Sequence, residues 1–179
     1  MEKEKRKGLI IVHTGNGKGK TTAAMGMALR AAGHNLKVLM IQFIKGTWPY
    51  GELESVKRLY PDFMIMPMGK GFIRFDREGP DPEDREAVIE AWNFFREKME
   101  SREFDMIILD EINYVISYNL LDVKDLLEAI KNRPLELHLV LTGRDAHPDV
   151  IEIADLVTEM REIKHPFKDG IKAQKGIEF

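Results

Sequence analysis

Short apolar runs recur along the chain, and their composition predicts buried β-strands. Most of these runs lack the strict alternation of polar and apolar residues that marks a strand with one exposed face. Five of the runs are clear, and a sixth is weaker. They are GLIIVH (8–13), KVLMIQF (37–43), FMIMPM (63–68), DMIILDE (105–111), ELHLVLTG (136–143) and the weaker DLVTEM (155–160).

Helical periodicity fills the segments between these runs, most clearly over residues 82–102. There Val88, Trp92, Phe95 and Met99 fall on one face, which we expect to pack on a sheet. Buried strands that alternate with helices predict an α/β fold of three layers, with a mostly parallel sheet of five to six strands flanked by helices. In such folds ligands bind at the carboxyl ends of the strands.

Composition narrows the class of protein. The chain has 179 residues, 44% of them hydrophobic, which predicts a single domain over 1–179. Its 27 basic and 30 acidic residues offer no basic excess, so we expect no nucleic-acid partner. Cysteine is absent, which excludes disulfides and thiol nucleophiles. No apolar run reaches the roughly 20 residues of a membrane span, and no signal peptide is evident, so we expect a cytoplasmic protein without a membrane partner.

Three segments carry no clear periodicity. Residues 44–51 and 67–82 are irregular connections, and the second is long enough to suggest a functional loop. Residues 164–179 are expected to form an extended C-terminal tail.

The stretch HTGNGKGKTT (13–22) joins the first predicted strand to a predicted helix over 21–33. Glycines in this setting let backbone N–H groups converge into an anion nest, and the start of the helix adds partial positive charge. Lys20 would contact phosphate oxygens, Thr21 would coordinate Mg²⁺, and Lys18 adds further charge. The pattern therefore predicts a phosphate-binding loop.

The loop departs from the strict pattern G-x-x-x-x-G-K-[ST] at one position. The pattern asks for glycine at position 14, where this chain has Thr14, and the glycine is displaced to Gly15. A glycine-rich turn with incidental lysines is the simpler alternative. Such a turn needs only one or two glycines, which favours the phosphate loop.

A metal-side acid is expected opposite the loop, and the strand over 105–111 ends in Asp110 and Glu111. An acid at the end of a strand is often only a helix cap. Paired with the loop, either carboxylate could bind Mg²⁺ directly or through water. Position alone does not separate the two residues.

Several stretches in the same order closely resemble those of the corrinoid adenosyltransferases, a family with a phosphate-loop, RecA-like fold. The resemblance runs from about residue 8 to residue 179. The matching stretches are TGNGKGKTTAA (14–24), QFIKGTWPYGE (42–52), GKGF (69–72), LDEINY (109–114), LTGRDAHPD (141–149) and KHPFKDGIKAQKGIEF (164–179). The displaced glycine of the loop is itself a feature of the family.

The resemblance implies a reaction in which the Co(I) centre of a reduced corrinoid attacks C5′ of ATP and inorganic triphosphate leaves. Lys20, Thr21 and Glu111 would be the catalytic residues, and Thr21 and Glu111 the Mg²⁺ ligands, with Asp110 behind them. It also implies an electron-donating reductase and a homodimer. The residues expected to bind ATP are Gly15, Asn16, Gly17, Lys18, Gly19, Lys20, Thr21 and Thr22.

The corrinoid pocket is expected to include Phe72, Arg74, Phe75 and Trp48. Phe72 matches the first aromatic residue that the family uses to displace the lower axial ligand of the corrinoid. Arg74 stands where the second aromatic residue is usual, and the neighbouring Phe75 is the candidate substitute. Only seven residues precede the first strand, so we expect no N-terminal lid over the site.

Arg144 follows the strand over 136–143, where a guanidinium could contact phosphate or ribose. An ion pair with Asp145 or Asp149 is the alternative. Lys45 stands in a similar position after another strand.

Two other functions fit the loop and the acid. A RecA-like enzyme would hydrolyse ATP to ADP and phosphate, and a carrier would bind nucleotide or corrinoid without chemistry.

Overall fold

The computed structural model describes residues 7–46, 50–71, 73 and 80–178. The strands are β1 (Ile10–Thr14), β2 (Val38–Gln42), β3 (Phe63–Pro67), β4 (Met106–Asp110), β5 (His138–Thr142) and β6 (Leu156–Glu159). The α-helices are α1 (Lys20–Ala32), α2 (Gly51–Val56), α3 (Pro82–Ser101), α4 (Ile112–Ser117), α5 (Val123–Asn132) and α6 (Pro148–Ile153). Short 3-10 helices are η1 (Lys57–Leu59) and η2 (Pro166–Asp169).

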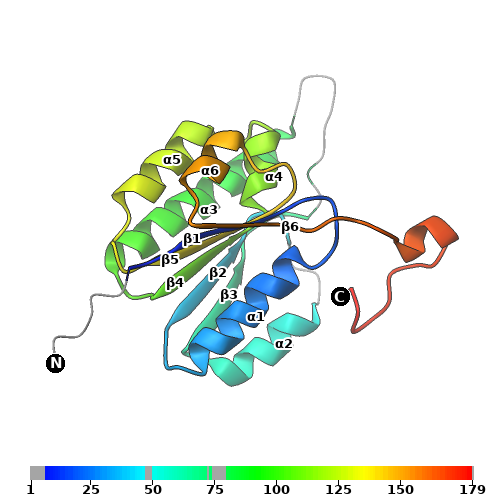
Figure 1. The fold of residues 1–179 in the computed structure, drawn as a ribbon, viewed down its shortest axis with the longest axis horizontal. Coiled ribbons are helices and arrows are strands. Elements are labelled where there is room, and N and C mark those ends of the chain that lie inside the picture. Colours follow the sequence, from blue (N-terminus) through cyan, green and yellow to red (C-terminus); the bar gives the residue numbers. More distant parts are fainter. Residues whose placement is uncertain (1–6, 47–49, 72, 74–79, 179) are drawn as a thin grey trace.

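All six strands of the described ranges join one sheet in the order β3-β2-β4-β5-β1-β6, and every neighbouring pair is parallel. The predicted α/β fold with a parallel sheet is confirmed (Figure 1). β5 lies between β1, which precedes the glycine-rich loop, and β4, which ends in Asp110. The loop and the acid thus meet at the carboxyl edge with one strand between them.

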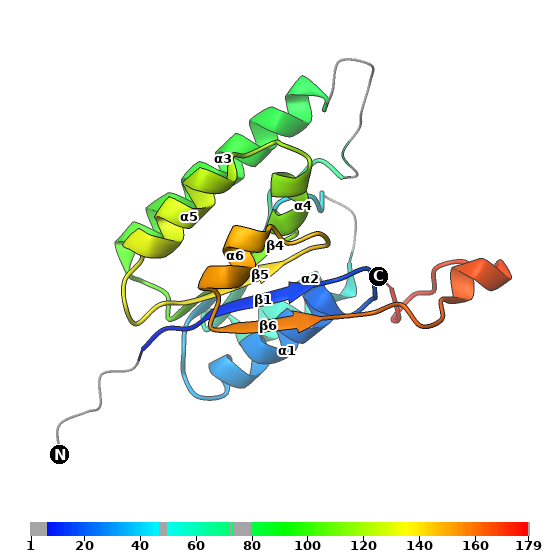
Figure 2. The ribbon, with the colours of Figure 1, turned by 45° about the horizontal axis from the view of Figure 1, so that its top comes forward.

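Helices cover both faces of the sheet, which gives the three predicted layers. α1 and α2 lie on one face, and α3, α4, α5 and α6 lie on the other (Figures 1 and 2). Alternate residues of each central strand face opposite cores: Ile107 packs toward α3, whereas Ile108 packs toward α1. The buried side of α1 consists largely of alanines, and this lets the helix approach the sheet closely.

α3 is the longest of the described helices, and its start follows standard capping rules. The Asp81 side chain accepts a hydrogen bond from the backbone N–H of Glu83, and Pro82 occupies the first helical turn. The four residues predicted to share an apolar face are all buried, as expected. They are Val88, Trp92, Phe95 and Met99.

β6 differs from the expectation of strands buried on both faces. It lies at the edge of the sheet and pairs only with β1 among the described strands, and all four of its residues are exposed, with Leu156 at 48%. Edge position and sparse helical cover explain the difference. After β6 the chain runs away from the sheet through η2 and then turns back (Figure 2). In the part of the chain described, no helix is long and apolar enough to cross a bilayer.

Candidate functional site

The glycine-rich loop connects β1 to α1 at the carboxyl edge of the sheet. Gly15 and Gly19 have φ of 92° and 108°, a left-handed backbone region that favours glycine. Gly19 is the residue before α1, and the first turn of that helix contains no acidic residue. The N–H groups of a helical first turn have no partner within the helix, so they present partial positive charge to the loop.

The chain leaving β6 crosses directly over the loop, and this contact explains why two positions must be glycine. The backbone N–H of Gly17 donates to the Met160 carbonyl over 2.7 Å. A Cβ on Gly15 would collide with that carbonyl oxygen, and one on Gly17 would stand 2.8 Å from it. Thr14, at the position where the strict pattern has glycine, instead accepts a hydrogen bond from the backbone N–H of Ala146 over 3.2 Å.

The side chain of Lys20 folds back onto the loop that precedes it. Its Nζ donates to the carbonyl oxygens of Gly15 and Gly17, over 2.8 and 2.7 Å. Burial lowers the pKa of the ammonium, while the carboxylate of Glu111 opposes that shift. Because an ammonium has three N–H donors, these two bonds leave one for an anion in the loop.

Asp110, the last residue of β4, is fully buried at the centre of a hydrogen-bond network. Its Oδ1 accepts from the hydroxyls of Thr21, over 2.9 Å, and Thr142, over 2.7 Å. Its Oδ2 accepts from Nε2 of Gln42 over 3.2 Å. This carboxylate therefore ties the start of α1 to the ends of β2 and β5.

Glu111 follows Asp110 and precedes α4, and its environment is quite different. Its backbone is left-handed, with φ of 67°, and its N–H donates to Thr142 Oγ1 over 2.9 Å. The carboxylate oxygen Oε2 is buried and has no hydrogen-bond partner among the residues described. Burial, followed by the nearby charge of Asp110, raises the pKa of the Glu111 carboxyl to about 7.

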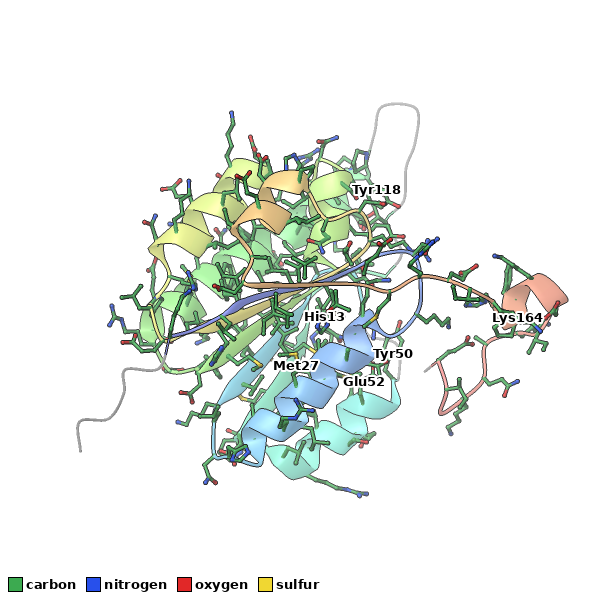
Figure 3. All side chains as sticks on the ribbon, viewed as in Figure 1. His13, Met27, Tyr50, Glu52, Tyr118 and Lys164 are labelled. Atoms are coloured by element: carbon green, nitrogen blue, oxygen red, sulfur yellow. The ribbon has the colours of Figure 1, made fainter. Side chains whose placement is uncertain are left out.

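A cleft of about 1130 Å³ opens in front of the loop and of Glu111. Its walls come from residues 16–22, the chain just after β2, α2, α4, the chain just after β5, and the chain beyond β6. In Figure 3, Glu52 on α2 and Tyr118, directly after α4, lie on opposite sides of the carboxyl edge of the sheet. The volume lies just above the roughly 300–1,000 Å³ of a site for one drug-sized ligand, so a nucleotide bound at the loop would not fill the cleft.

Ion pairs and aromatic rings line the cleft. Lys18 pairs with Glu178 of the returning C-terminal segment over 2.5 Å, and Lys45 pairs with Glu52 over 2.9 Å. Tyr114 on α4 packs edge-on against Tyr118, the residue after the helix, with 5.0 Å between ring centroids. Near Lys164 the C-terminal segment stands clear of the sheet, before it returns to the loop (Figure 3).

The structure brings most of the expected site residues together. Residues 16–22, Glu111 and Arg144 line the cleft, and Asp110 lies behind Thr21. Arg144 is exposed, and within the described ranges it forms no ion pair with Asp145 or Asp149. The expected corrinoid-pocket residues lie outside the residues described. They are Trp48, Phe72, Arg74 and Phe75.

Sequence reasoning did not single out Gln42, Thr142, Tyr114 or the ion-pair partners of the lysines as site residues. For the first two a signal existed, because each is a polar last residue that follows three or more apolar residues of its strand, as Asp110 is. The register sets Gln42 beside Asp110. A row of polar strand ends across a parallel sheet therefore marks the site.

Comparisons with known proteins show what the chain is similar to. A sequence model of the ATP:corrinoid adenosyltransferase BtuR/CobO/CobP family matches residues 6–179. The corrinoid adenosyltransferase of Escherichia coli (strain K12) is 42% identical over 173 residues, 97% of this chain and 86% of that protein. The corrinoid adenosyltransferase CobA of Salmonella typhimurium (strain LT2) is 40% identical over 176 residues, 98% of this chain and 88% of that protein.

Among solved structures, the flagellar accessory protein FlaH from Methanocaldococcus jannaschii has a similar fold. The TM-score is 0.56 at 17% sequence identity, and the match covers 86% of this chain and 71% of that one. This likeness concerns the fold alone.

Proposed function

Because the chain belongs to the ATP:corrinoid adenosyltransferase family, we propose that it transfers the 5′-deoxyadenosyl group of ATP to the Co(I) centre of a corrinoid. The observation that carries this proposal is the cleft of about 1130 Å³, which the phosphate loop, Glu111 and the aromatic residues Tyr114 and Tyr118 line together. ATP would lie against the loop, and the corrinoid would approach its ribose from the side of Tyr114 and Tyr118.

The reaction needs no nucleophile from the protein. The electron pair of Co(I) forms the bond to C5′, while the C5′–O bond breaks and its electrons leave with inorganic triphosphate. The loop N–H groups, Lys18, Lys20 and Arg144 would stabilise the charge that develops on the leaving group. The walls of the cleft would hold C5′ in line with the cobalt and exclude water.

The residues present fit a Mg²⁺ ion bound together with the triphosphate. Thr21 and Glu111 provide oxygen donors, and the unpartnered Oε2 of Glu111 is a carboxylate oxygen still free to bind a cation. Asp110 already accepts three hydrogen bonds, which favours its role as the residue that orients Thr21. When bound, Mg²⁺ would neutralise part of the triphosphate charge.

For the corrinoid we propose a pocket next to Tyr114 and Tyr118. Ile73 lines the cleft, and its neighbours in sequence are Phe72 and Arg74. Lys45 and Gly51, which also line it, flank the segment that contains Trp48. These neighbours support the corrinoid roles inferred for Trp48, Phe72, Arg74 and Phe75, including displacement of the lower ligand by Phe72.

The remaining parts of the proposal concern the protein in the cell. We propose that an electron-donating reductase supplies Co(I), that the protein is a homodimer, and that it acts in the cytoplasm. Residues 1–179 would form one nucleotide-binding domain with a C-terminal tail from residue 164. The one sheet that all described strands join supports the single domain.

The test is an anaerobic assay with chemically reduced cob(I)alamin, ATP and Mg²⁺, followed by Co(I) absorbance and by triphosphate release. We expect Co(I) to disappear as triphosphate forms in equal amount, and Lys20→Ala to abolish both. Lys131→Ala, on the far helix α5, is the matched control. Corrinoid-independent formation of ADP would instead indicate a hydrolase, and tight binding without turnover would indicate a carrier.

A further inference from the structure

We propose that Thr142 is a positioning residue that holds Glu111 and Thr21 in place as a pair, an inference that rests on the proposed function. Thr142 is the last residue of β5, the strand between β1 and β4. It is fully buried, so it contacts neither substrate directly. Its hydroxyl nevertheless joins the two sides of the site.

The hydroxyl of Thr142 uses both of its hydrogen-bonding functions. It donates to Oδ1 of Asp110 over 2.7 Å, and it accepts from the backbone N–H of Glu111 over 2.9 Å. Thr21 donates its own hydroxyl proton to the same Oδ1 over 2.9 Å. Because that proton is committed to Asp110, the lone pairs of Thr21 remain available to a cation.

Glu111 needs this support because of its backbone. A glutamate in the left-handed region is strained, and such conformations persist only where the surroundings hold them. The bond from its N–H to Thr142 fixes the turn between β4 and α4 from the side of β5. Thr142 therefore couples the direction of the Glu111 side chain to the carboxylate that orients Thr21.

A second contact holds the turn between β4 and α4, and it involves Gly143, the residue directly after Thr142. Nδ2 of the buried Asn113 donates to the Gly143 carbonyl over 3.3 Å. Gly143 has φ of 127°, and a Cβ there would stand 2.9 Å from Cβ of Asn113. These contacts set the path of the chain into Arg144. Of the residues that hold this turn, Thr142 is the one whose hydrogen-bonding group can be removed with little change in the shape of the side chain.

The test compares Thr142→Val, which keeps the branched shape without a hydroxyl, with Thr142→Ser, which keeps the hydroxyl. ATP affinity is measured by calorimetry with excess Mg²⁺ and again with EDTA, without corrinoid. The ratio of ATP affinity with Mg²⁺ to ATP affinity with EDTA measures the contribution of the cation. We expect this ratio to fall about tenfold or more in Thr142→Val, because one hydrogen bond to a charged group contributes a free energy of that size. Its affinity in EDTA should match the wild type, and Thr142→Ser should restore the gain.

The same variants are then compared in the adenosyl-transfer assay, where kcat should fall in Thr142→Val and recover in Thr142→Ser. An unchanged Mg²⁺ gain in Thr142→Val, or equal impairment of the two variants, would overturn the inference. Equal loss of ATP affinity with and without Mg²⁺ would also overturn it, because that result indicates a structural role. If Thr142→Val does not fold, Thr142→Ala is read against the same criteria.

The calorimetric measurement of ATP binding tests the role of Thr142 independently of the proposed function, because it contains no corrinoid. A wild-type protein that shows the Mg²⁺ gain but transfers no adenosyl group to cob(I)alamin would refute the proposed function. The role of Thr142 would still be decided by the calorimetry.

Discussion

Replacing Glu111 with glutamine should stabilise the metal-free protein while it removes activity. The Glu111 carboxyl is buried beside Asp110, and these two effects raise its pKa from 4.5 to about 7, although Lys20, Lys45 and Arg144 act in the opposite direction. In the unfolded chain the carboxyl regains its ordinary pKa. The folded protein therefore binds more protons than the unfolded chain between these two values, and wild-type stability falls as pH rises through this interval.

The magnitude follows from the size of the pKa change. A shift from 4.5 to about 7 corresponds to about 3 kcal/mol at a pH above both values. Glutamine keeps the size of the side chain and removes its charge, so Glu111→Gln should gain up to about that amount at pH 8. For a chain of this length, about 3 kcal/mol raises Tm by about 6–12 °C. The gain should shrink below pH 7 and vanish below about pH 4.5.

The assay is thermal unfolding of both proteins in EDTA, from pH 4 to pH 8. Glu90→Gln, which replaces an exposed carboxylate on α3, serves as the control and should show no pH-dependent gain. Addition of ATP with Mg²⁺ at pH 8 should reverse the order, because only the wild type offers the carboxylate oxygen. A Glu111→Gln variant that is no more stable than the wild type at pH 8 would refute the reasoning.

Three further predictions concern the ion pair between Lys18 and Glu178 in the cleft, the contacts of Asp155 beside the edge strand β6, and the buried core. Glu178→Gln should release Lys18 and tighten ATP binding by about twofold at low salt, with little difference at high salt, because the Lys18 side chain is more than half exposed. Weaker binding at low salt would contradict this prediction. Asp155 has a lowered pKa because its carboxylate accepts hydrogen bonds from the backbone N–H of Ile10 and from Lys7. At pH 7, Asp155→Asn should therefore unfold at a lower urea concentration than the wild type. This difference in urea midpoint should fade as pH drops below 4. Phe95→Ala should cost about 3–5 kcal/mol in chemical denaturation, because the ring is fully buried, and a loss below about 1 kcal/mol would exclude that packing role.

The fold could be predicted from the sequence because five of the six described strands are apolar enough to be recognised one by one. The fold class could be predicted without the order of the strands in the sheet. Strands that alternate with helices already favour a parallel sheet with helices on both faces. The exception is β6, whose short run looked like another buried strand. The four residues of β6 carry no signal that distinguishes an edge strand from a central one, because the burial of a strand depends on the strands and helices that pack against it.

The site was predictable in part for a similar reason. The loop and the acid are local patterns, and the carboxyl edge of a parallel sheet brings them together without any knowledge of strand order. The partners of those residues depend on strand order and register. That β5 lies between β1 and β4, so that Thr142 reaches both Asp110 and Glu111, could not be read from spacing. The return of Glu178 to Lys18 over 160 positions was equally out of reach.

The cleft is arranged so that several of its cations already have internal partners. Lys20 donates to loop carbonyls, Lys18 pairs with Glu178, and Lys45 pairs with Glu52. These internal partners hold the loop in shape when ATP is absent. A triphosphate would compete with the carboxylates for Lys18 and Lys45, whereas Lys20 would use its remaining N–H donor. Glu111 differs, because its buried Oε2 has no partner among the residues described. A bound cation would supply the missing contact, so the carboxylate that costs stability in the free protein is the one whose charge the substrate complex needs.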